Sequence, residues 1–124
     1  VDPGYALTVA QLRGDALLAL DLVDDARDVY ASLSGDAESR TVRDLGLGEC
    51  ALAREKAQDA LVAFGAALEG TADRYYQAEA HAGLVRAFVE AGKVDLAERH
   101  YEILRDEYSD RADALARAGG ALGR

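Results

Sequence analysis

The 124-residue sequence contains little that would break or cross-link a helix. It has one proline, one cysteine, no methionine, no tryptophan and only two phenylalanines. Alanine and leucine are abundant instead, and proline is the residue least compatible with a helix interior, so the composition predicts an all-α fold. A lone Cys50 can form neither an internal disulfide nor a cysteine metal cluster.

Long apolar runs and an excess of positive charge are also missing. No segment approaches the ~18 apolar residues of a membrane span, so direct membrane insertion is not expected. The net charge is −9, and phosphate backbones attract basic surfaces, so nucleic-acid binding is not expected either. The acidity is strongest in residues 1–40. That bias fits a basic partner near the first helices, or simply a solvated acidic face.

The chain does contain an internal repeat. An alanine followed four residues later by an aromatic residue occurs three times, as Ala26 and Tyr30, Ala60 and Phe64, and Ala97 and Tyr101. On a helix these two positions lie one turn apart on the same face. The pattern predicts helices that approach closely at the alanine, with the aromatic ring filling the gap between them.

The third copy resembles a tetratricopeptide repeat. This family pairs a Leu-Gly-x-x-Tyr helix with an Ala-x-x-x-Phe helix through a turn glycine. The matching residues are Leu84, Phe88, Gly92, Ala97 and Tyr101, and the departures are His81, Val85 and Ser109. The second copy matches at Leu47, Gly48, Ala51, Ala60, Phe64 and Ala67, and the weaker first copy at Gly14, Leu17, Ala26, Tyr30 and Leu33.

The resemblance implies a single all-α domain over residues 1–124, a right-handed α-α superhelix of about seven helices. Its repeats would span about 7–40, 41–77 and 78–111, with a capping helix at about 110–121. The expected helices are 4–20, 24–33, 37–53, 57–69, 73–91, 95–107 and 110–121. Asp2-Pro3 favours a helix start, Gly92 a left-handed turn, and Asp73 or Thr71 and Asp95 the caps of later helices. We interpret the domain as processed, or as excised from a longer chain. A cytoplasmic location is favoured, and a periplasmic one stays open.

In the tetratricopeptide family, which this sequence resembles, the first helix of each pair lines a concave groove. By that resemblance the groove candidates are Gln11, Asp15 and Leu18, then Leu45, Glu49 and Leu52, then Ala82, Arg86 and Val89. The last residue of each trio would form an apolar stripe for a partner peptide or helix. The alternative is that these apolar residues pack against the adjacent pair. Arg86 is the only cation in the set, so a carboxylate clamp of the kind some family members use is not expected.

No hydrolytic, phosphate-binding or metal motif is found, and no cofactor, metal ion or catalytic residue is expected. His81 and His100 fall on different helices of one pair with no recurring acidic partner, so we interpret them as packing residues. Cys50 aligns with Ala16 and Ala87 in a column of small residues, which favours a buried packing cysteine. Gly46 and Gly48 are best explained by close helix packing.

These observations favour an interaction or scaffold module rather than an enzyme. The partner would be a protein or peptide, basic or apolar in character. The alternative is a regulatory or oligomerisation domain of a larger protein, with self-association left open. Tyr5, Tyr75 and Tyr76 are candidate interface anchors, because tyrosine is enriched where surface becomes buried on binding.

Overall fold

The computed structural model describes residues 3–124, and within that range every regular element is a helix, seven in all. The helices are α1 (Pro3–Ala19), α2 (Val23–Ala31), α3 (Ala37–Ala53), α4 (Ala57–Gly70), α5 (Arg74–Glu90), α6 (Val94–Glu107) and α7 (Ala112–Ala121). Each predicted range agrees with its helix to within two residues at either end. The all-α prediction is therefore confirmed. Asp2 lies outside the described residues.

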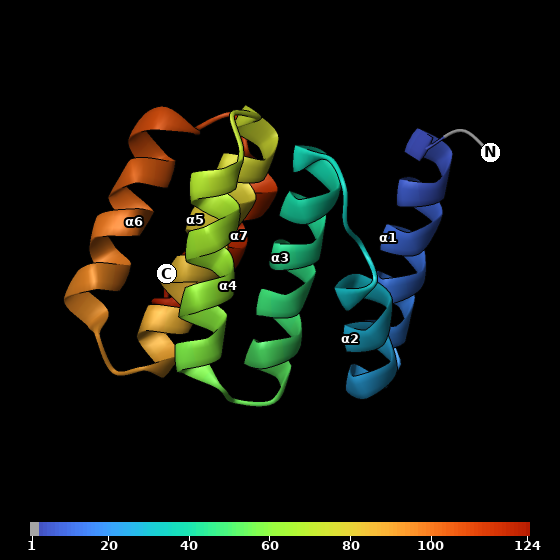
Figure 1. Ribbon diagram of the computed structural model, residues 1–124. Helices are drawn as coiled ribbons and strands as arrows, with labels where there is room; N and C mark the ends of the chain where they lie inside the picture. The colour runs from blue at the N-terminus through green and yellow to red at the C-terminus, as the bar shows by residue number, and fades with distance from the viewer. Residues whose placement is uncertain (1–2) are drawn as a thin grey trace.

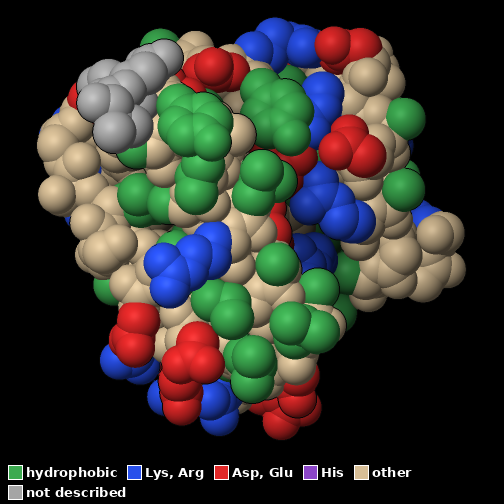
Figure 2. Space-filling view, turned by 90° about the vertical axis from the view of Figure 1, so that its right-hand side faces the viewer, with side chains coloured by type: hydrophobic (Ala, Val, Ile, Leu, Met, Phe, Trp, Pro, Cys, Tyr) green, Lys and Arg blue, Asp and Glu red, His purple; other side chains and the backbone are tan. Residues whose placement is uncertain are grey.

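The helices are arranged as a solenoid in two layers (Figure 1). Each helix packs on its neighbours in sequence, and α1, α3, α5 and α7 also pack on one another in that order. Within residues 3–124, α2, α4 and α6 make no such contacts among themselves. We call α1, α3, α5 and α7 the first layer and α2, α4 and α6 the second layer. Figure 2 views the end of this array at which α1 lies.

The rings of Tyr30 and Phe64 reach from the second layer into slots between first-layer helices. Each ring is 1% exposed and lies against glycines on two helices. A Cβ atom added to any of these glycines would come within 2.3–2.7 Å of the ring, closer than real Cβ contacts allow. The glycines are Gly14 and Gly46 around Tyr30, and Gly48 and Gly83 around Phe64. Close packing thus explains glycines that otherwise cost a helix about 1 kcal/mol each.

The third aromatic residue of the repeat, Tyr101, is packed differently. Val85 occupies on α5 the repeat position held by Gly14 and Gly48, and Tyr101 is only partly buried. A Cβ atom added to Gly119 of α7 would meet the Tyr101 ring at an ordinary contact distance, 3.5 Å, so no slot encloses this ring as one encloses Phe64. The surrounding core consists mainly of small and branched residues from α5, α6 and α7: Ala78, Ala82, Val85, Ala97, Leu104, Ala114 and Ala118. Helix α7 thereby packs on both α5 and α6.

Some helix boundaries follow the predicted local signals, whereas the N-cap residues of α2, α4, α6 and α7 make no side-chain capping bond. Gly92 adopts φ +77° after α5, as predicted. Asp73 caps α5 by accepting the Tyr75 backbone N–H at 2.8 Å. The prediction that Asp95 caps α6 is wrong, because α6 begins at Val94 and its N-cap residue is Lys93. Asp95 lies instead in the first turn, where the positive end of the helix dipole stabilises its negative charge.

Candidate functional site: a groove along the first-layer helices

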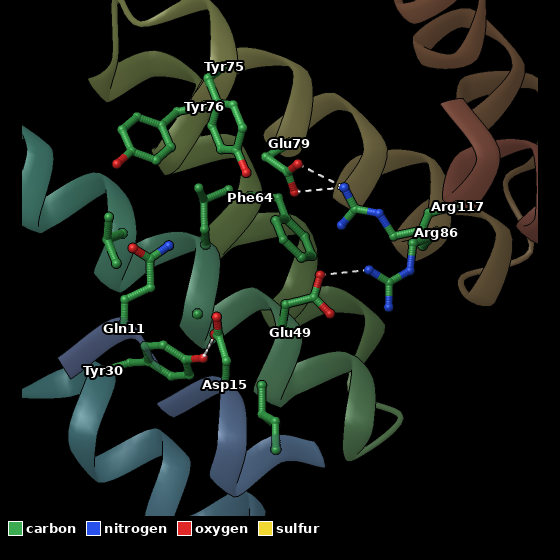
Figure 3. Close-up of a pocket in the computed structure, with 14 residues that line it drawn as sticks. Gln11, Asp15, Tyr30, Glu49, Phe64, Tyr75, Tyr76, Glu79, Arg86 and Arg117 are labelled. Carbon is green, nitrogen blue, oxygen red and sulfur yellow. Dashed lines mark hydrogen bonds and ion pairs between the residues drawn. The ribbon is translucent and has the colours of Figure 1, made fainter. Parts of the chain in front are cut away.

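A groove of about 370 Å³ runs along the first layer, lined by residues of α1, α3, α5 and α7 (Figure 3). Tyr30 and Phe64 reach it from the second layer. The lining residues are Gln11, Asp15, Leu18, Tyr30, Val42, Leu45, Gly46, Glu49, Phe64, Tyr75, Tyr76, Glu79, Arg86 and Arg117. The groove therefore crosses all three helix pairs and the terminal helix.

The structure brings most of the groove candidates together. Gln11, Asp15 and Leu18 line the groove from α1, Leu45 and Glu49 from α3, and Arg86 from α5. Repeat register thus places one face of each first-layer helix in the same groove, although the three helices are far apart in sequence.

Leu52, Ala82 and Val89 do not line the groove. Ala82 is 1% exposed and belongs to the core that α5 forms with α6 and α7, and Val89 packs against that core. Leu52 packs on the cluster around Phe64. For Leu52 and Val89 the packing alternative applies, because neighbouring helices cover them. Leu18 is consequently the only member of the expected apolar stripe that faces the groove.

The three candidate tyrosines occupy different places. Tyr75 and Tyr76 lie at one end of the groove, with their rings edge to face at a centroid distance of 5.6 Å. Tyr75 is 53% exposed. The Tyr76 hydroxyl donates to Glu38 at 3.0 Å, and burial together with that bond raises the pKa of Tyr76 to about 12. Tyr5 lies on the outer side of α1 and does not line the groove.

The charged groups of the groove are bound to one another or, for Asp15, to a tyrosine hydroxyl. Arg86 donates to Glu49 at 2.6 Å between α5 and α3, and Arg117 donates to Glu79 at 2.8 Å between α7 and α5. The Tyr30 hydroxyl donates to Asp15, and burial of the ring, reinforced by this bond, raises the pKa of Tyr30. An acidic chain thus presents a groove whose local charge is nearly balanced.

Sequence reasoning missed Glu79 and the arginines that bind it. Glu79 lies seven residues before Arg86 and therefore on the same helix face, so extending the α5 trio by one turn toward the N-terminus would have found it. Arg117 and Arg111 come from the region of α7, which is not a copy of the repeat. Arg111 donates to Glu79 at 2.6 Å and lies over the Tyr75 ring at 3.9 Å.

The remaining titratable candidates, Cys50, His81 and His100, lie between packed helices. Cys50 is 2% exposed, and burial raises its pKa to about 11, so its thiol stays protonated. His81 and His100 prove to be direct neighbours, with their Nδ1 atoms 2.9 Å apart. Burial, with His100 as a second cause, lowers the pKa of His81 to about 4, and burial also lowers that of His100. In residues 3–124 no three metal-ligating side chains converge.

Over the same residues no helix is long and apolar enough to cross a bilayer. Comparison of the chain with family models, with curated proteins and with solved structures yields no match.

Proposed function

We propose that this chain is a tetratricopeptide-like interaction module that holds a segment of a partner protein in the first-layer groove. The observation that carries the proposal is the convergence of one repeat position from three helices. Asp15, Glu49 and Arg86 hold equivalent repeat positions, and all three line one groove of about 370 Å³, the kind of surface that repeat-built solenoids use for binding. The repeated alanine-aromatic seams support the family resemblance.

The pairing of charges defines the chemistry of the bound segment. The carboxylates of Glu49 and Glu79 already accept bonds from arginines, and Asp15 accepts one from a tyrosine hydroxyl. A strongly basic partner would have to displace those bonds, whereas a segment of neutral and apolar residues would not. We therefore favour an uncharged or weakly charged peptide, with the exposed Tyr75 ring as an aromatic contact at the end of the groove.

A charge swap tests this site without removing an ion pair. The double variant Glu49→Arg with Arg86→Glu inverts the polarity of the groove while it retains a pair between α3 and α5. The matched control is Asp24→Arg with Arg54→Asp, which swaps the 2.7 Å ion pair between α2 and the end of α3. Peptides selected from a displayed random library on the wild-type chain should bind the control unchanged. They should bind the groove variant at least about tenfold more weakly, a loss of ~1.4 kcal/mol, because the swap moves the long arginine side chain from α5 to α3 and so reshapes the surface on which an uncharged segment lies. Equal binding to both variants, with circular dichroism unchanged, would remove the groove from the proposal.

A regulatory or oligomerisation role is the second candidate. It is favoured by a separate observation, the exposed apolar side chains of α1, among which Tyr5 is 66% and Leu12 64% exposed. An enzymatic role is not part of the proposal. The buried thiol of Cys50 and the seam location of both histidines favour packing roles for the residues most capable of chemistry.

A further inference from the structure

The outer face of α1 carries a stripe of apolar side chains that no helix within residues 3–124 covers. We define the α1 stripe as Tyr5, Val9, Leu12, Ala16 and Leu20, where Leu20 directly follows the helix. Its larger members are 66%, 44%, 64% and 69% exposed, in the order Tyr5, Val9, Leu12, Leu20. The spacings of four, three and four residues between the first four members keep them on one side of a helix. Figure 2 shows hydrophobic side chains on the end of the molecule that α1 forms.

The repeat register shows how this face differs from the internal seams. Gly46 on α3 and Gly83 on α5 receive the rings of the preceding second-layer helices. The equivalent position on α1 is Leu12. A helix pair stacked on α1 in the way that α1 and α2 stack on α3 would drive its aromatic ring into the Leu12 side chain. The α1 stripe is therefore built for a different contact from the internal ones.

Charge separates α1 from the rest of the molecule as well. Its seventeen residues contain one arginine and one aspartate, Arg13 and Asp15, so the helix is neutral in a chain of net charge −9. Two copies of an acidic protein repel each other least where their neutral surfaces meet. That condition points to a second copy of this chain as the occupant.

We propose that two copies of the chain associate through α1, antiparallel and about a two-fold axis near Leu12. In this arrangement Leu12 faces Leu12 of the other copy, Tyr5 faces Leu20, and Val9 faces the small Ala16. The stripe is thus complementary to itself, as a two-fold interface requires. The two helix dipoles point in opposite directions, which is the favourable arrangement for neighbouring helices. The exposed fractions of the four large side chains amount to roughly 500 Å² per copy, against about 800 Å² for a standard interface. The dimer is accordingly weak and reversible, and it leaves the groove accessible because no stripe residue lines the groove.

Analytical ultracentrifugation of the wild-type chain from micromolar to millimolar concentration tests the association. We expect the mass to rise toward that of a dimer. Leu12→Glu should keep the mass of a monomer throughout this range, because it places a carboxylate on the two-fold axis. The matched control is Val62→Glu on α4, a site that is 73% exposed and lies outside the stripe, and it should dimerise like the wild type. A wild-type chain that stays monomeric, or a Leu12→Glu chain that still dimerises, would overturn the proposal.

Disulfide trapping tests the geometry independently. On mild oxidation Leu12→Cys should form a covalent dimer faster than Val62→Cys, while the buried Cys50 stays unreactive in both. A mixture of Tyr5→Cys and Leu20→Cys chains should form mainly the mixed disulfide, because these positions face each other only in the antiparallel arrangement. Trapping of Leu12→Cys no faster than the control, or a predominance of the Tyr5→Cys homodimer, would contradict the α1 contact as described.

Discussion

Two sets of contacts between packed helices, one around Phe64 (the Phe64 seam) and one around Tyr101 (the Tyr101 seam), join successive helix pairs by different means. Phe64 is 1% exposed because Gly48 and Gly83 let its ring approach two helix backbones. Tyr101 is partly buried, and the repeat position equivalent to Gly48 is Val85. The seam at α5, α6 and α7 relies instead on a wider alanine-rich core and on arginines that bridge helices. The Phe64 seam concentrates its stabilisation in one ring, whereas the Tyr101 seam distributes it over many small contacts.

Truncation of the two rings should give the largest difference between the seams. Phe64→Ala should lower the free energy of unfolding by about 3–5 kcal/mol, because it leaves a cavity between glycine-bearing helices that cannot easily collapse. Tyr101→Ala should cost about 1–2 kcal/mol, because part of that ring is already in solvent. Urea denaturation of the two variants gives both values. Equal losses would show that the glycine slot confers no special stability.

Acid should weaken the seam that contains the histidine pair before it weakens the Tyr30 seam. The folded-state pKa of His81 is about 4, below the ~6.5 of an exposed histidine, so the unfolded chain binds more protons between these values. The free energy of unfolding should therefore fall as the pH drops from 6.5 to 4, by at most roughly 3 kcal/mol. The protection factors of backbone amides, which correct for the intrinsic pH dependence of exchange, should fall more in α6 than in α2 over that window.

The variant His81→Phe separates this effect from the titration of the many carboxylates. It removes the titrating ring but keeps an aromatic residue near Tyr108 and His100. The pH dependence between 6.5 and 4 should be shallower in this variant. An unchanged slope would mean that the pair is not the acid-sensitive element.

Glycine-to-alanine substitutions should have opposite signs at two helical sites. Gly83→Ala places a Cβ 2.4 Å from the Phe64 ring, and overpacking of this kind costs about 1–3 kcal/mol. Gly65 on α4 has no atom within 4 Å of an added Cβ, so Gly65→Ala should stabilise the chain by about 0.5–1 kcal/mol through helix propensity. Thermal unfolding of both variants tests the pair. Stabilisation by Gly83→Ala would contradict the slot described for Phe64.

Loss of an arginine bridge should give the smallest difference between two compared sites. Arg111 has a side chain 12% exposed and donates to Glu79, so Arg111→Met should cost about 1–2 kcal/mol by leaving that carboxylate with one partner fewer. Arg105→Met removes an exposed pair with Asp106 and should change stability by less than about 0.5 kcal/mol. If both variants lost less than about 0.5 kcal/mol in the free energy of unfolding, apolar packing alone would stabilise the Tyr101 seam.

The local features of the fold were predictable from the sequence. Helical periodicity and the low proline content predicted each helix to within two residues, and the alanine-aromatic columns predicted the seams. Repeat register also predicted Gln11, Asp15, Leu18, Leu45, Glu49 and Arg86 as groove residues, because equivalent positions on successive first-layer helices face the same way. Those inferences need only the spacing of residues along a helix.

Tertiary packing decided the rest. Whether Leu52 and Val89 face the groove or a neighbouring helix depends on how closely consecutive pairs approach, which is set by contacts between residues remote in sequence. The Glu79–Arg117 bond arises because α7 returns against α5, and the contact between His81 and His100 because α6 packs on α5 in one register. A one-dimensional repeat predicts which side of a helix is apolar. Only the packed array determines which neighbour covers that side and which charges meet.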